Sequence, residues 1–179
     1  MSSGGRILAG ADRNITFTGA TLQIGTELPG AVPTAAGLLT LQTTGTGLLT
    51  MQTGSILDFD LFSGAGQGDN TGIVASADRA IILGGVDLSS STILKVANPT
   101  GMTTWAANDQ WRLFDWTGLS GPVSGSIAAF DLPSLPDGLT WNTADLLTSG
   151  VLSISLVPEP SRVIFLVFGA MSLLSRRRR

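Results

Sequence analysis

The chain has 179 residues, a length that suits one domain or a short array of repeats. It contains no Cys, no His and no Tyr, which excludes disulfides, thiol catalysis, Cys/His zinc sites and histidine general bases. Its net charge of −3 is unevenly placed. Residues 1–157 hold 12 acidic and five basic groups (−7), and residues 158–179 hold one acidic group and five Arg (+4). The acidic body disfavours a nucleic-acid partner.

Amino-acid usage favours β-structure. Gly, Ser and Thr make up about a third of the chain, whereas Glu and Lys together number three. Solvent-facing helices are usually rich in Glu and Lys, so we predict an all-β body.

The N-terminal residues 1–30 show no secretory signal peptide, because only Ile7, Leu8 and Ala9 follow Arg6 before the next polar stretch. The stretch 13–26 instead predicts strand, turn and strand, with alternating apolar residues. We therefore expect the chain to begin inside a β-array, with an export signal and further repeats encoded upstream of a truncated reading frame.

A ten-residue repeat follows, in which GLLTLQTTGT (37–46) precedes GLLTMQTGSI (47–56). Alternation places Leu39 and Leu41 on one face of the first copy and Leu49 and Met51 on one face of the second. Each copy provides one strand and one turn, so the pair predicts either a hairpin or two successive edges of a solenoid.

Further strands are predicted with turn signals every ten to fifteen residues. Their ranges are 56–62, 80–88 with an interruption at Gly84-Gly85, 92–96, 110–116, 127–132 and 151–157. Before Val163 the only helical candidate is a single turn around 143–147. This spacing suits a parallel β-solenoid (β-helix) or, alternatively, a β-sandwich.

The C-terminal residues 157–179 combine three elements in a fixed order. A Pro-Glu-Pro tripeptide ends the last strand, an uncharged run of twelve residues covers 163–174, and four Arg close the chain. As a helix the run would span about 18 Å, against a bilayer core of about 30 Å. Such a segment is short for a permanent anchor and is typical of a processed signal.

These elements resemble the PEP-CTERM sorting domain of Gram-negative bacteria, whose members are recognised by the membrane protease-transpeptidase exosortase. The resemblance covers residues 157–179 only, and Arg162 just after the motif departs from the simplest form. It implies a sorting motif, a hydrophobic segment forming one short helix, and a basic stop. The matching residues are Pro158, Glu159, Pro160 and Ser161; Val163, Ile164, Phe165, Leu166, Val167, Phe168, Leu173 and Leu174; and Arg176, Arg177, Arg178 and Arg179.

The body from about residue 55 resembles, in its layout of strands, Gly-Gly turn, aromatics and Pro-Gly loop, bacterial proteins with autotransporter-type β-strand repeats. That resemblance implies a solenoid stem with an irregular C-terminal β cap and no enzyme activity. We expect two parts: a β-rich repeat body (1–156) and the sorting signal (157–179).

Three candidate sites lie in the body. Asp58 and Asp60, at i and i+2 on a strand, form a carboxylate pair in principle, but a solvated outer face opposite Leu57, Phe59 and Leu61 is the favoured interpretation. The turn 64–70 faintly resembles a calcium-binding repeat, although it occurs once and a plain turn is favoured. Four Trp, at positions 105, 111, 116 and 141, fit either a sugar-stacking surface or, preferably, core packing.

Two function classes remain. The first is an exported, non-enzymatic structural or adhesin-like protein of the cell surface or extracellular matrix, needing no cofactor. Its expected partners are exosortase, the inner membrane as a transient or permanent anchor of the precursor, and an exopolysaccharide. The alternative is a carbohydrate- or calcium-binding module delivered by the same signal, and an enzyme ranks third.

Overall fold

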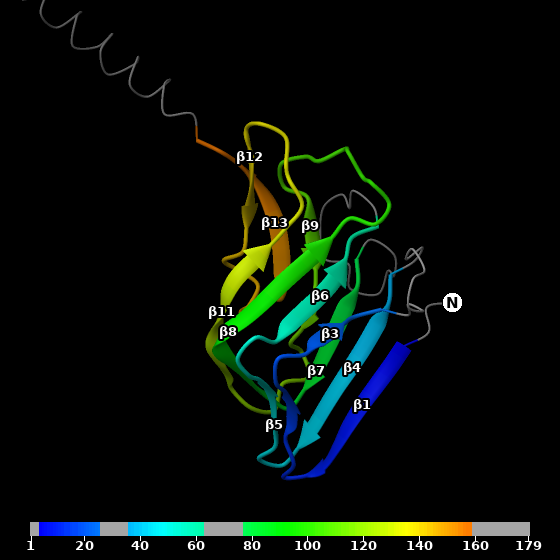
Figure 1. Cartoon of the computed structure of the whole chain (residues 1–179), viewed down its shortest axis with the longest axis vertical. Helices are drawn as coiled ribbons and strands as arrows, with labels where there is room; N and C mark the ends of the chain where they lie inside the picture. Colours follow the sequence, from blue (N-terminus) through cyan, green and yellow to red (C-terminus); the bar gives the residue numbers. More distant parts are fainter. Residues whose placement is uncertain (1–3, 26–35, 63–76, 159–179) are drawn as a thin grey trace, which may run out of the picture.

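The computed structural model describes residues 4–25, 36–62 and 77–158 (Figure 1). All regular structure in these ranges is β-strand. The strands are β1 (Gly4–Ala11), β2 (Ile15–Phe17), β3 (Thr21–Gln23), β4 (Leu38–Thr44), β5 (Leu48–Met51), β6 (Ile56–Asp60), β7 (Arg79–Leu83), β8 (Gly85–Ala97), β9 (Gln110–Arg112), β10 (Phe114–Asp115), β11 (Val123–Asp131), β12 (Leu139–Asn142) and β13 (Val151–Leu156).

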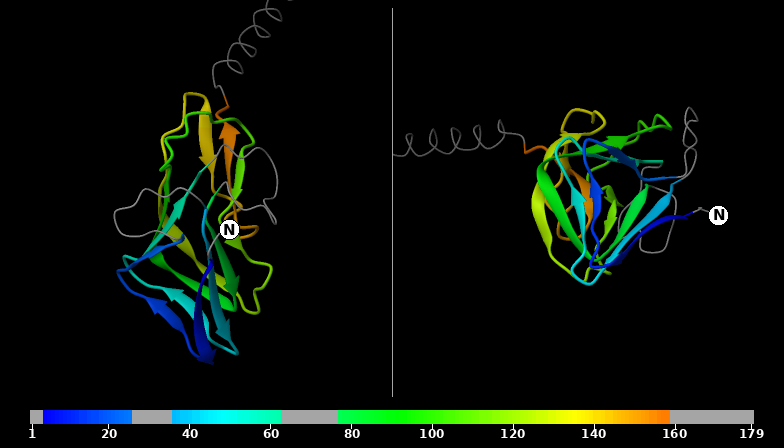
Figure 2. Two further views of the ribbon diagram at one scale, coloured as in Figure 1. Left: turned by 90° about the vertical axis from the view of Figure 1, so that its right-hand side faces the viewer. Right: turned by 60° about the horizontal axis from the view of Figure 1, so that its bottom comes forward.

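The strands form two parallel sheets. Sheet A has the order β1-β4-β7-β10, and sheet B has the order β2-β5-β8-β6-β3 with β11 on the free edge of β8. The chain passes from one sheet to the other and back, so that each passage adds one layer. We number these layers coil 1 (β1, β2, β3), coil 2 (β4, β5, β6), coil 3 (β7, β8) and coil 4 (β10, β11). Figure 2 shows the two sheets as opposite walls around the core.

Successive coils lie in parallel register. Leu38 pairs with Gly4, 34 positions before it, and with Arg79, 41 positions after it. In sheet B, Leu57 pairs with Leu22 of coil 1 and with Leu94 of coil 3. Since parallel pairing stacks equivalent positions, inward-facing apolar side chains form columns that run through the coils.

The predicted fold class, a β-solenoid with a cap and a C-terminal helix, is wrong as stated. No helix is found in residues 4–25, 36–62 and 77–158, and the hydrophobic segment 163–174 for which the helix was predicted lies outside the described residues. The alternative, a β-sandwich, is also wrong, because strands in sheets A and B are parallel whereas sandwich sheets are antiparallel. The described structure consists of the two parallel sheets and one antiparallel sheet.

The helical turn predicted around 143–147 is a set of tight turns. The carbonyl oxygen of Asp145 accepts hydrogen bonds from the backbone N–H groups of Thr148, Ser149 and Gly150 at 3.3, 2.8 and 3.0 Å. Gly150, with a φ of 80°, then redirects the chain into β13. The left-handed residue ends the turn before a helix can propagate. The described part of the chain contains no helix able to cross a bilayer.

The two copies of the ten-residue repeat are consecutive strands of one coil. The first copy forms β4, which pairs with β1 and β7, and the second forms β5, which pairs with β2 and β8. The hairpin alternative is therefore wrong. In both copies the Gln side chain reaches coil 1, since Gln42 accepts from Arg6 and Gln52 accepts from the Thr18 hydroxyl.

Polar side chains close the corner between sheets A and B. The carboxylate of Asp12 accepts hydrogen bonds from the backbone N–H of Thr46 at 2.8 Å and from the Thr46 hydroxyl at 3.1 Å. The side-chain oxygen of Asn14 accepts from the backbone N–H of Leu48 at 2.9 Å. Where the chain bends, the backbones of adjacent coils no longer pair with each other. These two side chains accept the hydrogen bonds of the backbone N–H groups that are left without a backbone partner.

A third sheet, with the order β12-β13-β9, is antiparallel and lies at the end of the stack where coil 4 is (Figure 1). The backbone N–H groups of Leu113 and Phe114 both donate to the carbonyl oxygen of Gly150, at 2.9 and 3.2 Å. This sheet therefore continues the wall of sheet A beyond coil 4 and protects the edge of β10.

The centre of the core gives the first prediction. Phe59 is fully buried and meets Phe114 edge to face with ring centroids 5.1 Å apart. Phe59→Ala should lower the free energy of unfolding by about 3–5 kcal/mol, because it leaves a cavity between two coils. Phe130→Ala removes the same atoms from a side chain that is 42 % exposed, so it should cost less than half as much. Urea unfolding would compare the two, and equal losses would contradict this packing.

Candidate functional site

The predicted sorting motif begins where the chain leaves the body. β13 ends at Leu156, and the backbone N–H of Val157 donates to the carbonyl oxygen of Gly138 at 2.9 Å. Leu156 and Val157 are 67 % and 44 % exposed, and Pro158 is exposed as well. The remaining predicted residues, Glu159, Pro160, Ser161, the hydrophobic segment 163–174 and Arg176–Arg179, lie outside the described residues.

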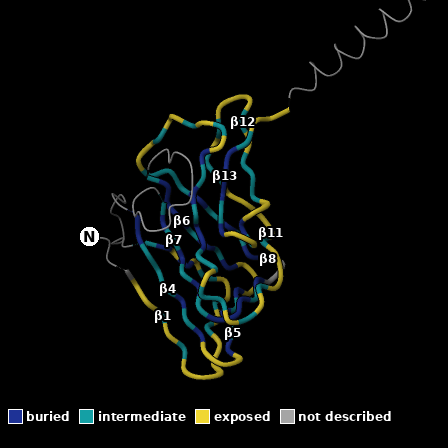
Figure 3. Tube along the Cα trace, turned by 180° about the vertical axis from the view of Figure 1, so that it is seen from behind, coloured by how far each residue is buried: buried dark blue, intermediate teal, exposed yellow. Residues whose placement is uncertain are grey.

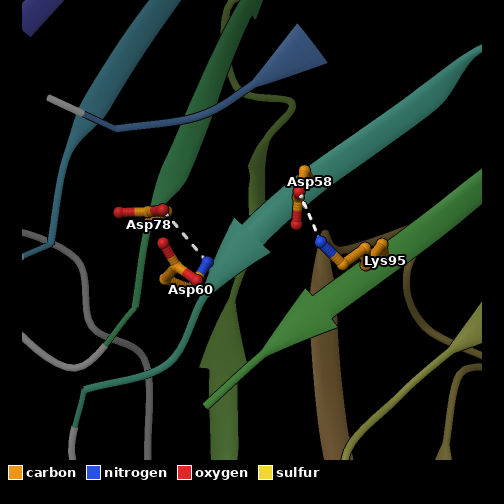
Figure 4. Close-up of polar contacts among 4 residues, drawn as sticks. All are labelled: Asp58, Asp60, Asp78 and Lys95. Atoms are coloured by element: carbon orange, nitrogen blue, oxygen red, sulfur yellow. Dashed lines mark hydrogen bonds and ion pairs between the residues drawn. The ribbon is translucent and has the colours of Figure 1, made fainter. Parts of the chain in front are cut away.

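The two candidate carboxylates of β6 have different surroundings (Figure 4). Asp58 forms an ion pair with Lys95 of β8, with 2.8 Å between Oδ2 and Nζ. The hydrogen bond from Lys95 to Asp58 raises the pKa of Lys95 above its ordinary value, against the opposing effect of burial, and the charges of Asp58, Asp131 and Asp60 add to the rise. The pair joins coils 2 and 3 on the outer face of sheet B.

Asp60 corrects the prediction of a solvated outer face, because it is only 6 % exposed. Its backbone N–H donates to Oδ2 of Asp78 at 3.0 Å, and its carbonyl oxygen accepts from the backbone N–H of Asp78 at 2.9 Å. The inward prediction for Leu57, Phe59 and Leu61 is confirmed by their burial. Asp58 and Asp60 thus take part in two separate contacts, and Figure 4 shows Asp60 beside Asp78 and Asp58 farther along β6.

Asp78 is a buried carboxylate that joins three segments of the chain. It has no exposed surface, and its Oδ1 accepts from the backbone N–H of Gly37 at 2.6 Å while Oδ2 accepts from Asp60. Arg79, the next residue, donates its N–H to the carbonyl oxygen of Gly37 at 3.0 Å. Each carboxylate oxygen thus has a backbone N–H donor, which offsets the cost of burying this polar side chain.

Two glycines make room for this carboxylate. A Cβ on Gly37 would lie 2.3 Å from the Cα of Gly25, and a Cβ on Gly25 would lie 3.2 Å from Oδ2 of Asp78. Gly25 also has a φ of 144°, which side-chain-bearing residues rarely adopt. Coils 1, 2 and 3 meet at this corner, and only residues without a side chain allow the backbones to approach so closely.

The four Trp side chains pack within the body. Trp105, Trp111 and Trp141 contact one another with ring centroids 5.5 to 5.9 Å apart, and Trp111 is fully buried. The indole N–H of Trp141 donates to the Pro133 carbonyl oxygen at 2.8 Å. Trp116 stacks on Phe114. These mutual contacts agree with core packing and give no support to a sugar-stacking surface.

The candidate calcium turn, 64–70, lies outside the described residues. Within the described residues no group of three or more acidic side chains is placed to hold a metal ion.

Sequence reasoning did not single out Asp78. The only available signal is an aspartate directly before the apolar run of β7, a position that also occurs in ordinary turns. Its two acceptor roles depend on Gly37 and Asp60, which are 41 and 18 positions away. Such long-range contacts leave no local sequence pattern.

Comparison with known proteins finds no match, whether among protein-family models, curated proteins or solved structures. A functional proposal therefore depends on the residues of this chain.

Asp78→Asn should destabilise the body. An amide keeps one acceptor oxygen but presents an NH₂ group to the second backbone donor, so one buried N–H loses its partner. We expect the free energy of unfolding to fall by about 1–3 kcal/mol. Asp137→Asn, on an exposed turn, is the matched control and should change it by less than about 0.5 kcal/mol. Similar losses in the two variants, measured by urea unfolding, would show that Asp78 does not join the coils.

Lys95 should titrate above its ordinary pKa of 10.5. Since its pKa is raised on folding, its contribution to stability is complete below 10.5 and is lost as pH rises through the folded value. Both partners touch solvent, so the contribution should not exceed about 1 kcal/mol. The chain has one Lys and no Tyr, His or Cys, so a single lysine NMR resonance reports this titration without overlap.

Asp58→Asn is the control for this titration, because it removes the partner but keeps Lys95. The pKa of Lys95 should then move back toward 10.5, and the loss of stability as pH rises above 10.5 should become smaller. An unchanged pKa in this variant would mean that the ion pair does not form in solution.

Proposed function

We propose that the chain is an exported, non-enzymatic structural or adhesin-like protein of a bacterial cell surface or extracellular matrix, sorted through residues 157–179. One observation carries this proposal: the order of a Pro-Glu-Pro motif at 158–160, an uncharged run at 163–174 and four Arg at the C-terminus. The basic residues are expected to stay on the cytoplasmic side while the apolar run enters the bilayer.

The described end of the body supports access to such a motif. Pro158 is exposed, and it follows Val157, whose hydrogen bond to Gly138 is the last backbone contact described. A processing enzyme needs an accessible segment, and the first residue of the motif, Pro158, meets this requirement. The proposed partner is a membrane protease-transpeptidase of the exosortase type, which would cleave at the motif and release the body from the inner membrane.

The body supports a structural role through the use of its polar groups. Asp78 accepts backbone hydrogen bonds between coils, Asp58 pairs with Lys95, and Asp12 closes a corner. In each case the carboxylate binds a neighbouring coil. A stack in which charged side chains join layers is suited to bearing load or presenting a surface, and an exopolysaccharide is the proposed surrounding material.

Processing of the tail tests this proposal. The full chain, preceded by a secretory signal, would be expressed in a Gram-negative host with an exosortase and analysed by intact-mass spectrometry. We expect the mature body to lack Arg176–Arg179. A variant with alanine at 158, 159 and 160 should keep the complete tail and remain in the membrane fraction.

Pro136→Ala is the control, because Pro136 is exposed in a loop of the body outside the motif. It should be processed like the unmodified chain. A mature exported protein that retains all four C-terminal Arg would refute processing, and processing of the triple-alanine variant would refute the role of the motif.

A further inference from the structure

The stack ends at coil 4 in two walls whose inner faces carry exposed apolar side chains. In sheet B, parallel pairing joins four inward residues into one column through coils 1 to 4: Leu22, Leu57, Leu94 and Phe130. The three Leu side chains are buried, whereas Phe130 on β11 is 42 % exposed. Within the described residues β11 pairs only with β8, so no further coil covers it. The column therefore ends in an exposed aromatic ring.

The opposite wall also loses its cover toward this end. Alternate residues of β13 share one face, on which Leu152 and Ile154 are buried but Leu156 is 67 % exposed. Val157, the next residue, is 44 % exposed. Figure 3 shows exposed stretches along β11 and where the described chain leaves β13. We call Phe130, Leu156 and Val157 the apolar rim.

The path of the chain is described on both sides of the apolar rim. Beyond β11 the chain passes through residues 132–138 to β12 and returns along β13 to Val157. Figure 2 shows β11 and the end of the described chain on the side of the body away from β1. The apolar rim and the start of the tail thus lie at the same end of the body.

The uncharged run in the tail limits how far this end can lie from a bilayer. Six residue steps join Val157 to Val163, where the run begins, and they span at most about 20 Å when fully extended. Once the run is inserted, the apolar rim is tethered within that distance of the membrane surface. A tether raises the effective concentration of a weak contact, so a small apolar surface can bind without a large area.

Size and charge favour an uncharged lipid surface over a protein partner. One side chain buries at most about 250 Å², so three partly exposed ones provide well under the roughly 800 Å² per partner of a stable protein interface. Residues 123–158 carry three acidic groups, Asp131, Asp137 and Asp145, and no basic group. Anionic headgroups would therefore not attract this end, and the contact has to be apolar.

We propose that the apolar rim is a membrane-contact surface, on which the tethered body rests against the interfacial region of the bilayer. This inference rests on the proposed insertion of the tail and extends it to the folded body. Phe130 from one wall and Leu156 from the other would enter the boundary between headgroups and acyl chains, where exposed apolar side chains are favoured. The contact would hold Pro158, the first residue of the sorting motif, at the bilayer surface, where a membrane enzyme acts.

Quenching by labelled lipid tests this contact, because the chain contains no Cys and single labels can be introduced. Ser134→Cys, exposed in the loop after β11, and Arg6→Cys, exposed on β1, would each carry a nitrobenzoxadiazole fluorophore in the full chain. Each protein is mixed with phosphatidylcholine vesicles in which some headgroups bear a nitroxide, and bound protein is isolated by flotation. We expect quenching at position 134 and little at position 6.

Substitutions in the apolar rim separate its role from that of the tail. Phe130→Ser combined with Leu156→Ser should still float with the vesicles but lose the quenching at position 134. Leu8→Ser is the matched control, because Leu8 is 58 % exposed on β1, and it should leave that quenching unchanged.

Four other results would contradict the inference. A chain that floats without quenching at position 134, or a double variant that is quenched like the unmodified chain, would refute the membrane contact and leave tail insertion standing. A blue-shifted emission at position 134 without lipid quenching would assign the apolar rim to a second copy. A chain that does not float would refute tail insertion and the inference with it.

Discussion

Parallel hydrogen bonding between successive coils is the constraint on which the rest of the structure depends. A parallel ladder stacks each residue on its equivalent one layer away, so every coil must return the chain to the same register after 34 to 41 residues. Within the sheets the backbone meets this requirement itself. At the corners it cannot, and there Asp12, Asn14 and Asp78 supply the missing acceptors.

The strands could be predicted from sequence where alternation is regular. In β6 the alternation of apolar and polar residues indicates which side chains are buried, and Leu57 and Phe59 are buried as expected. In β13 the same alternation fails at two positions, because Ser153 is buried and Leu156 is 67 % exposed. β1 was missed because glycines interrupt its apolar residues. The predicted strand 80–88 joins β7 to the start of β8, although the chain bends between them at Gly84. The predicted gap between 88 and 92 divides β8, which runs unbroken from Gly85 to Ala97.

The candidate site is predictable only in part, because the surroundings of its carboxylates depend on residues that are distant in the sequence. The position of Asp58 and Asp60 on one strand is local information, but their different environments depend on Lys95 and Asp78 of other coils. A period-two pattern treats both residues as outward. Burial of Asp60 arises because the strand ends there and the next coil crosses it. For the C-terminal tail the situation is the opposite. Its three elements follow one another in the sequence and can be recognised there, whereas the described structure ends at Pro158.

The aromatic residues have a consequence for how unfolding would be observed. With no Tyr in the chain, intrinsic fluorescence comes from the four Trp, and all of them lie between residues 105 and 141, near coil 4 and the antiparallel sheet. Emission therefore reports on one end of the stack. If coil 1 separates from coil 2 first, that step is optically silent, and a single fluorescence transition would describe the C-terminal end rather than the whole body.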